Sequence, residues 1–345
     1  MGAKTEISWT DATWNPVRGC SRVSEGCRRC YAERLAARNL PGLSSPVTGL
    51  PYAAVMADGL AHWTGRVELI ESALELPLRW RKPRKIFVNS MSDLFHESLS
   101  EKAIDRVFGV MARAREHTFQ VLTKRPERML AYLQRFRPDG EGFVTRDGGE
   151  YTTSGFIGNP ARWPLPNVWL GVSVENQATA DARIPQLLLT PAAVRFVSAE
   201  PLLGPISVAP FLPRPMHLSE IPGWALNDGC TEGKTRGLDW VIVGGESGPG
   251  ARPCNVAWIR SIVRQCKAAD VACFVKQFGA NVYGCNDDGF EGDTPTSWPM
   301  DTRYRGVCNW QGFPVHVLPH DRKGGDPAEW PEDLRVRELP EVPRG

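Results

Sequence analysis

The sequence has no long apolar run, no internal repeat, no low-complexity segment and little net charge. No stretch approaches the about 18 consecutive apolar residues of a membrane-spanning helix, which excludes a helical membrane protein. The amino-terminal residues MGAKTEISWTDATWNP lack the apolar core of a signal peptide, and Glu6 stands where a myristoylation site needs Ser or Thr. We therefore expect a cytoplasmic protein without a membrane partner, in which thiols stay reduced.

The composition also lacks the biases of fibrous or disordered chains. Of the 345 residues, 42% are hydrophobic and 23% are charged, which excludes a disordered, collagen-like or coiled-coil protein. The net charge of +2 permits nucleic-acid binding without demanding it. Any contact with nucleic acid is therefore expected to be local.

What the sequence does contain in unusual number is cysteine, with nine residues. Cys20, Cys27 and Cys30 form a C-x6-C-x2-C cluster in GCSRVSEGCRRCY. Cys266 lies in a helical pattern and Cys273 in an apolar strand, so both are predicted to be core residues. The other cysteines lie in loop-like sequence and receive no role: Cys230, Cys254, Cys285 and Cys308.

The three clustered cysteines are candidate metal ligands. Structural zinc needs four ligands, but no second C-x2-C exists and no histidine precedes His62, with His96 the next one. Three thiolates also suit a four-iron, four-sulfur (4Fe–4S) cluster with one open iron, where a small molecule can bind. The cluster is favoured, while zinc and simple reduced thiols stay open as alternatives.

Apolar segments and amphipathic segments alternate along the chain. Strands are predicted over about residues 85–91, 118–124, 168–175, 192–200, 239–247 and 272–278, with a short first strand near Thr5–Trp9. Helices are predicted over about 31–40, 103–114, 126–136, 180–189 and 256–269. Short apolar strands alternating with helices indicate a parallel sheet covered on both faces.

The fold is therefore predicted to be α/β, a partial (β/α) barrel of the TIM-like type formed as a single domain over residues 1–345. Its core spans about 1–278, with loop insertions at about 137–165 and 207–237. The extension over about 279–345 is loop-rich, and Trp310 and Trp330 are expected to anchor it on the barrel.

Polar residues follow nearly every predicted strand, and the carboxyl ends of barrel strands form the active-site face. We therefore expect these residues to share one site: Asn89, Ser90, Asp93, Lys124, Ser173, Glu175, Ser198, Glu200, Gly244, Gly245, Glu246, Lys276 and, close behind its strand, His96. Lys124 and Lys276 are expected either to balance glutamates or to bind an anionic ligand group. Gly244 and Gly245 allow the backbone to approach a small molecule closely.

Several segments together resemble the phage and bacterial three-Cys-motif family of long-unknown function, which is itself similar to the radical S-adenosylmethionine (SAM) superfamily. They are SWTDATWNPVRGC, VNSMSDLFHE, VLTKRP, LGVSVE, FVSAEPLLGP, VIVGGESGPGARP and KGGDPAEWPEDLRVRELP. The resemblance implies a radical SAM-type barrel in which Cys20, Cys27 and Cys30 hold a 4Fe–4S cluster. It also implies an electron donor such as flavodoxin or ferredoxin, and a three-Cys-motif partner protein.

The resemblance further implies a place for SAM. Asn89, Ser90 and Asp93 occupy the early strand end where superfamily members bind SAM, and Gly244-Gly245-Glu246 matches their GGE motif, although it stands late in the chain. Three residues at the later strand ends are also expected to bind the cofactor: Ser173, Glu175 and Ser198. The expected catalytic residues are His96, Lys124, Glu200 and Lys276.

The expected function is a radical SAM-like iron–sulfur enzyme that generates a 5′-deoxyadenosyl radical and modifies or repairs nucleic acid or a nucleotide. Two basic segments, RWRKPRK at 79–85 and the group over 113–128, favour a phosphate backbone as ligand, although a solvated rim explains them as well. Two alternatives stay open. One is a zinc-stabilised nucleic-acid-binding protein without redox chemistry, and the other is a non-radical barrel hydrolase.

Overall fold

The computed structural model describes residues 5–38, 44–56, 59–134, 164–214, 236–284, 303–305, 315–318 and 320–341. These residues form a mixed α/β structure that divides into two compact units. Unit 1 comprises Met1–Val172, Gln186–Arg195 and Val342–Gly345, and unit 2 comprises Ser173–Pro185 and Phe196–Glu341. The prediction of a single domain stays a prediction.

The predicted parallel sheet of seven strands is confirmed, with the hydrogen-bonded order β1-β6-β7-β8-β9-β10-β12. Its strands are β1 (Ala12–Trp14), β6 (Lys85–Val88), β7 (Thr118–Thr123), β8 (Val168–Ser173), β9 (Val194–Ala199), β10 (Trp240–Gly244) and β12 (Ala272–Gln277). The order follows the chain without the reversal that marks a doubly wound fold. A sequential order of this kind is the one expected of a (β/α) barrel.

The first strand was predicted too early. It begins at Ala12, which pairs with Ile86, and not near Thr5–Trp9. Trp9 is buried, and its ring packs on Phe87 at a centroid distance of 4.8 Å. It lies in a turn that the Thr10 amide closes by donating to the Ile7 carbonyl, and the Thr10 hydroxyl donates to the carbonyl of Lys85. A buried tryptophan within a turn therefore gave the apolar signal of a strand.

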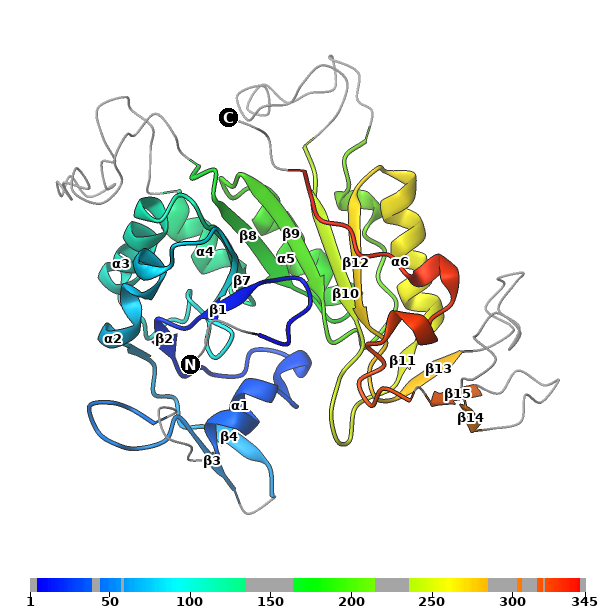
Figure 1. The fold of residues 1–345 in the computed structure, drawn as a ribbon, viewed down its shortest axis with the longest axis horizontal. Helices are drawn as coiled ribbons and strands as arrows, with labels where there is room; N and C mark the ends of the chain where they lie inside the picture. The colour runs from blue at the N-terminus through cyan, green and yellow to red at the C-terminus, as the bar shows by residue number, and fades with distance from the viewer. Residues whose placement is uncertain are drawn as a thin grey trace. The chain divides into compact units, whose positions relative to one another are not determined.

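In unit 1 the helices α3 (Glu101–Arg113) and α4 (Pro126–Leu133) lie beside strands β6 and β7 (Figure 1). Ser100 caps α3 by accepting a hydrogen bond from the Ala103 amide, and Pro126 opens α4 as predicted. The predicted apolar face of α3 is buried: Ile104, Val107, Phe108 and Met111. The remaining helices near the amino terminus are α1 (Tyr31–Ala36) and α2 (Glu71–Leu74), and the short strands are β2 (Val17–Arg18), β3 (Ala53–Val55), β4 (Ala61–Trp63) and β5 (Glu68–Leu69).

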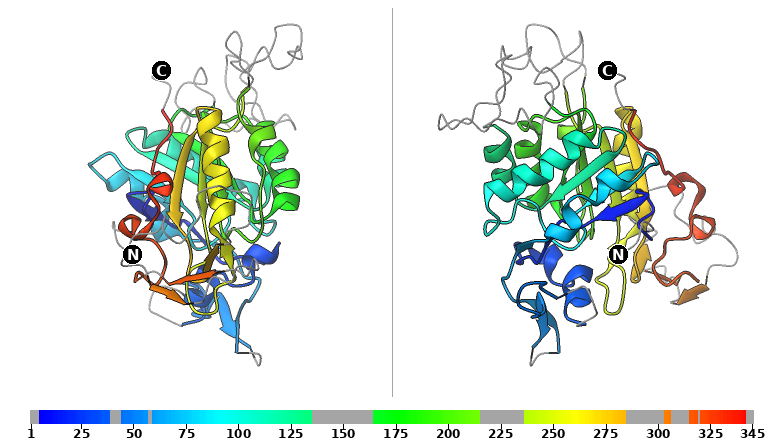
Figure 2. Two further views of the ribbon diagram at one scale, coloured as in Figure 1. Left: turned by 90° about the vertical axis from the view of Figure 1, so that its right-hand side faces the viewer. Right: turned by 60° about the vertical axis from the view of Figure 1, so that its left-hand side comes forward.

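The helix α5 (Gln177–Leu188) follows β8 and contains Pro185. In unit 2 the helix α6 (Val256–Ala268) packs along β10 and β12 (Figure 2). Cys266 and Cys273 are both buried, which confirms them as core residues, and Cys254 is buried in the short strand β11 (Cys254–Asn255). A second small sheet has the order β11-β13-β15-β14, with β13 at Val282–Gly284, β14 at Arg303–Arg305 and β15 at Val315–Leu318.

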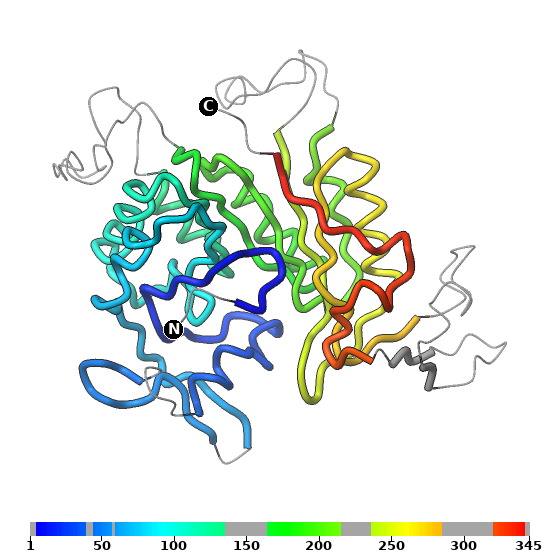
Figure 3. Tube along the Cα trace, in the orientation of Figure 1, coloured from blue at the N-terminus to red at the C-terminus, as the bar shows by residue number. Residues whose placement is uncertain are grey.

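The carboxyl-terminal segment runs along β12 (Figure 3). Its backbone pairs with the strand, because the Val275 amide donates to Val336 and the Glu338 amide donates to Cys273. Trp330 is fully buried and stacks on Phe278, with centroids 4.8 Å apart, which confirms Trp330 as an anchor. Trp310 lies outside the described residues, as do residues 137–163 and 215–235 of the predicted insertions and the cysteines Cys230, Cys285 and Cys308. No helix of the described part is long and apolar enough to cross a membrane.

Candidate metal centre

The three clustered cysteines lie in unit 1, on the segment that joins β2 to α1. Cys20 follows β2, Cys27 ends a short 3-10 helix over Glu25–Cys27, and Cys30 directly precedes α1. The residue before Cys20 has to be glycine. Gly19 has a φ of +87°, and a Cβ there would overlap the carbonyl of Arg66. This close approach fixes where the cysteine segment begins.

All three thiols are free and half-buried. Burial, with a further contribution from the Asp93 carboxylate, raises the pKa of Cys20 to about 12, against the opposing charge of Arg125. Burial also raises the pKa of Cys30, and its charge interacts with those of Cys20 and Cys27. A metal that binds here must displace the protons of the three thiols.

Among the described residues, no group of three His, Cys, Asp or Glu side chains lies close enough together to hold a single metal ion. A 4Fe–4S cluster places each thiolate on a different iron, so it requires thiols that surround a larger volume. The donor set of three cysteines on one short segment fits such a cluster in its chemistry, because thiolates are its usual ligands.

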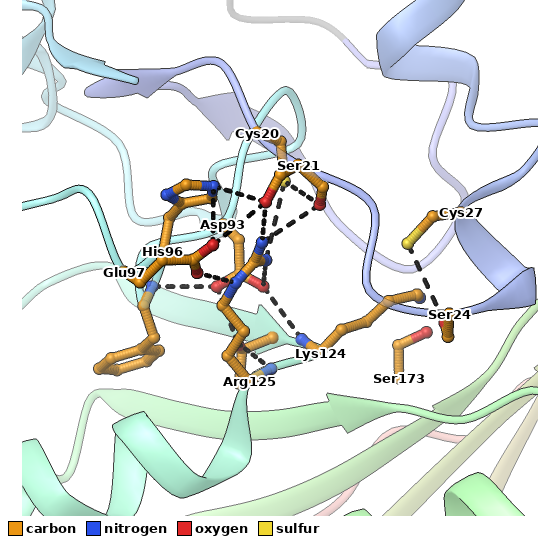
Figure 4. A network of polar contacts seen from close by, with 12 residues as sticks. Cys20, Ser21, Ser24, Cys27, Asp93, His96, Glu97, Lys124, Arg125 and Ser173 are labelled. Carbon is orange, nitrogen blue, oxygen red and sulfur yellow. Dashed lines mark hydrogen bonds and ion pairs between the residues drawn. The ribbon is translucent and has the colours of Figure 1, made fainter. Parts of the chain in front are cut away.

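Arg125 follows the end of β7 by two residues and connects the cysteine segment to the sheet (Figure 4). Its Nη1 lies 3.8 Å from Cys20 Sγ and 3.2 Å from Asp93 Oδ2. Its Nη2 donates to the carbonyl and the hydroxyl of Ser21 at 3.1 and 2.8 Å, and its Nε donates to Glu97 at 2.8 Å. The pKa of Arg125 is raised, since Asp93 and the other anions outweigh the opposing effect of burial.

His96 also contacts this network but is oriented by its neighbours. The amide of Ser98 donates to His96 Nδ1 at 3.1 Å, so the ring proton of the neutral imidazole lies on Nε2, which contacts the Ser21 hydroxyl at 2.8 Å. Burial, followed by the charge of Arg125, lowers the pKa of His96. The contacts of His96 therefore orient Ser21; its predicted acid–base role stays a prediction.

The three residues predicted at the early strand end follow β6 closely. Asn89 has a φ of +60° and its Oδ1 accepts from the Val17 amide, whereas its buried Nδ2 has no hydrogen-bond partner. Asn tolerates this left-handed backbone better than most residues. Ser90 donates to Asn15 Oδ1 and its carbonyl accepts from the Tyr31 hydroxyl. The unpaired amide of Asn89 is an unsatisfied donor of the kind that a bound ligand can complete.

Asp93, in contrast, has its carboxylate occupied by the protein. It accepts from the amide of Phe95 at 2.9 Å, from the Thr123 hydroxyl at 2.7 Å and from the amide of Lys124 at 3.0 Å, besides Arg125. These bonds join the loop after β6 to the end of β7. Lys124 itself is half-buried, and its charge lowers the pKa of Cys30 against the effect of burial.

Positive charge lies on the cysteine segment itself. Arg28 and Arg29, between Cys27 and Cys30, are exposed. Arg28 makes a long ion pair with Glu25, at 3.6 Å between two exposed side chains. Two exposed guanidinium groups beside the candidate cluster give this part of unit 1 local affinity for anions.

The predicted basic segment at residues 79–85 lies elsewhere in unit 1. It leads into the amino end of β6, whereas Asn89 follows the carboxyl end of that strand. Trp80 is engaged within the fold, with its ring 6.0 Å from that of His117 and the Arg84 guanidinium 5.1 Å above it. Arg113 and Arg115 likewise lie before the amino end of a strand, β7. Only Lys124, Arg125 and Arg128 of the second basic group follow the carboxyl end of β7.

The remaining predicted site residues belong to unit 2. Three of their carboxylates have arginine or lysine partners: Glu175 pairs with Arg183 at 3.0 Å, Glu200 with Lys276 at 3.0 Å and Glu246 with Arg252 at 2.6 Å. The two predicted serines bond to one residue, because Ser173 donates to the Glu200 carbonyl and Ser198 to its carboxylate. Lys276 thus balances a glutamate, which was one of its two expected roles.

Gly244 and Gly245 face protein atoms. A Cβ on Gly244 would lie 2.8 Å from Glu200 Oε1, and one on Gly245 would overlap the carbonyl of Phe278. The amide of Gly245 donates to the Gln277 carbonyl at 3.0 Å. Both glycines therefore allow the ends of β10 and β12 to approach each other closely.

Sequence reasoning missed the residues that hold the cysteine segment in place. Ser21, Arg22 and Glu33 stand within or directly after the C-x6-C-x2-C pattern, and Glu97 follows His96. Glu33 is buried, and a buried carboxylate is almost always paired. Its place in the amphipathic pattern of α1 was therefore the available signal for a basic partner such as Arg22.

A family model described as a protein of unknown function, DUF5131, matches residues 4–299. No curated protein matches the chain, and neither does any solved structure.

Proposed function

Because the chain belongs to the DUF5131 family, whose description names no activity, we propose a function from its own residues: a radical SAM-like iron–sulfur enzyme. Its sheet is then part of a (β/α) barrel of the radical SAM type. One observation carries the proposal. Three free cysteines lie on one short segment that follows β2, where the charge of Arg125 acts on Cys20 and that of Lys124 on Cys30. The same strand β2 bonds to Asn89, whose buried Nδ2 is unpaired.

Each of these residues has a task in the proposed enzyme. Cys20, Cys27 and Cys30 bind a 4Fe–4S cluster, which supplies an electron for the cleavage of SAM when both are bound. The Asn89 amide donates a hydrogen bond to the bound cofactor. Lys124 offers a positive charge to the carboxylate of the bound SAM. An electron donor such as flavodoxin or ferredoxin supplies the reducing equivalent.

The proposed substrate is a nucleic acid or a nucleotide. Support comes from the exposed Arg28 and Arg29 next to the candidate cluster, on a chain whose net charge is only +2. Local positive charge of this kind attracts phosphate groups without making the whole protein a general polyanion binder. The three-Cys-motif partner protein is proposed as an accessory component.

The proposal is tested by anaerobic purification with iron supplied. We expect brown protein with about four irons per chain and matching sulfide. Dithionite and SAM should then release 5′-deoxyadenosine, and Cys27→Ala should lose iron, SAM binding and this product. Cys254→Ala is the matched control, because Cys254 is buried in β11 outside the cysteine segment. Colourless protein with one zinc per chain would favour the zinc alternative and contradict the proposal.

The substrate class needs a separate measurement. Fluorescence anisotropy with a short single-stranded DNA and a short RNA should show binding that weakens as salt rises. Arg29→Gln should weaken it further, while Arg81→Gln, in the basic segment before β6, should change it less. Equal losses in the two variants would contradict a contact local to the cysteine segment.

A further inference from the structure

The guanidinium of Arg125 has five N–H groups, and each one has an acceptor. Nε–H is directed to Glu97 at 2.8 Å, and the two N–H groups of Nη2 are directed to the carbonyl and hydroxyl of Ser21. One N–H of Nη1 is directed to Asp93. The acceptor that remains for the fifth is Cys20 Sγ, at 3.8 Å.

This arrangement leaves the guanidinium little freedom to move. The Arg125 side chain is 8% exposed, and its acceptors come from two separate parts of unit 1, the cysteine segment and the loop after β6. Cys20 and Arg125 lie 105 residues apart in the chain. A buried donor without a strong acceptor costs free energy, so the sulfur completes the set of partners that Arg125 requires.

A neutral thiol is a weak hydrogen-bond acceptor, whereas a thiolate bound to iron carries negative charge and accepts strongly. The geometry is therefore better suited to a metal-bound Cys20 than to the free thiol. Cys27 has a different neighbour, the Ser24 hydroxyl at 4.0 Å. Hydrogen bonds to the cysteine sulfurs and nearby charge are two of the factors that set the reduction potential of an iron–sulfur cluster.

We propose that Arg125 is a positioning residue that donates its fifth N–H to the sulfur of cluster-bound Cys20 and raises the reduction potential of the cluster. The inference rests on the proposed function, since it requires a bound cluster. In the reduction, one electron passes from the reductant, dithionite in the test, to the cluster, and no covalent bond forms or breaks. The fixed positive charge favours the state that carries the additional electron.

The test compares wild-type, Arg125→Gln, Arg125→Lys and Arg106→Gln proteins after anaerobic cluster reconstitution. Iron and sulfide content, circular dichroism and a potentiometric titration followed by EPR are measured for each. Arg125→Gln should have a more negative midpoint potential than wild type. The potential of Arg125→Lys should lie between the two, because lysine keeps the charge but lacks the planar set of guanidinium N–H donors. Arg106→Gln removes the same charge from an exposed pair with Glu71 and should leave the potential unchanged.

A second measurement covers the case in which Arg125→Gln fails to fold or to bind iron. Pulsed EPR of the reduced protein, labelled with ¹⁵N in its arginine side chains, should show a nitrogen coupling in wild type that is lost in Arg125→Lys. An unchanged midpoint potential in an iron-loaded Arg125→Gln, or an unchanged nitrogen coupling in Arg125→Lys, overturns this inference but leaves the proposed function standing. Failure of the wild-type protein to take up a cluster overturns the proposed function and this inference with it.

Discussion

Arg22 and Glu33 form a bidentate ion pair, buried at its Glu33 end, across the segment that contains Cys27 and Cys30. Arg22 Nη2 lies 2.8 Å from Glu33 Oε2, and Nε lies within 3.1 Å of both carboxylate oxygens. Both residues also bond to the strand β4, because Arg22 donates to the Ala61 carbonyl and Glu33 accepts from the Trp63 amide. The pair therefore joins the cysteine segment, α1 and the β3–β4 hairpin.

Glu33→Gln should destabilise this part of unit 1 by roughly 3 kcal/mol, the low end of the range for breaking a buried pair. Glutamine keeps the size of the side chain but leaves the Arg22 charge without its partner. Arg22 is 28% exposed and Glu33 only 2%, so water compensates part of the loss. Urea unfolding measures the change in the free energy of unfolding.

The exposed pair between Glu71 and Arg106 is the matched control for that substitution. Their side chains are 67% and 40% exposed, and Glu71→Gln should cost less than about 1 kcal/mol. A cost for Glu33→Gln no larger than that of Glu71→Gln would show that the buried pair does not hold the segment.

Gly19→Ala should destabilise the protein by at least about 1–3 kcal/mol and lower the iron content of the reconstituted protein. The reason is the overlap of the new Cβ with the Arg66 carbonyl, at a residue whose φ is +87°. Gly284→Ala serves as the control, because a Cβ at Gly284 meets no atom within 4 Å. Thermal unfolding and iron analysis of both variants check the prediction; equal stability of the two would refute it.

The stability of the protein should depend on pH through His96. Its pKa in the folded protein is lowered by burial and then by Arg125, so the unfolded chain, with a pKa of about 6.5, binds more protons just below that pH. The free energy of unfolding should therefore fall as the pH drops below about 6.5, by at most about 1.4 kcal/mol per pH unit from this residue. Urea unfolding at pH values above and below that range, with wild type and His96→Gln, measures the dependence. The variant should lose less stability than wild type, and identical losses would speak against His96 as the source.

Trp330→Ala should cost about 3–5 kcal/mol, as expected for removing a large buried aromatic side chain. Its ring stacks on Phe278 at 4.8 Å, its Nε1 donates to the Gly324 carbonyl, and the Arg337 guanidinium lies 5.1 Å from it. Thermal unfolding and limited proteolysis of the carboxyl-terminal segment are the measurements. A variant that unfolds like wild type and shows no new cleavage would contradict the role of Trp330 as an anchor.

The repeating elements of the fold could be predicted from the sequence because their signals are local. The apolar runs at β7 and β10 and the apolar face of α3 need only neighbouring residues to be recognised. The strand β1 was misplaced because it is only three residues long, and Trp9 imitated it.

The candidate site was predictable only in part. The cysteine segment is a local pattern, whereas the contact of Arg125 with Cys20 joins residues 105 positions apart and has no sequence signal. Asp93 was predicted as a cofactor ligand because it follows β6. Three protein donors besides Arg125 occupy it, which only the three-dimensional arrangement reveals.

The pairing of the carboxyl-terminal segment with β12 has a consequence for the order of synthesis. The amide of Cys273 bonds to the carboxylate of Glu338, which is 65 residues further along the chain. Until that segment leaves the ribosome, the outer edge of β12 presents unpaired backbone groups to any extended peptide nearby. We therefore expect the nascent chain to pass through a stage that is prone to aggregation, and chaperones that bind extended apolar peptides to protect it.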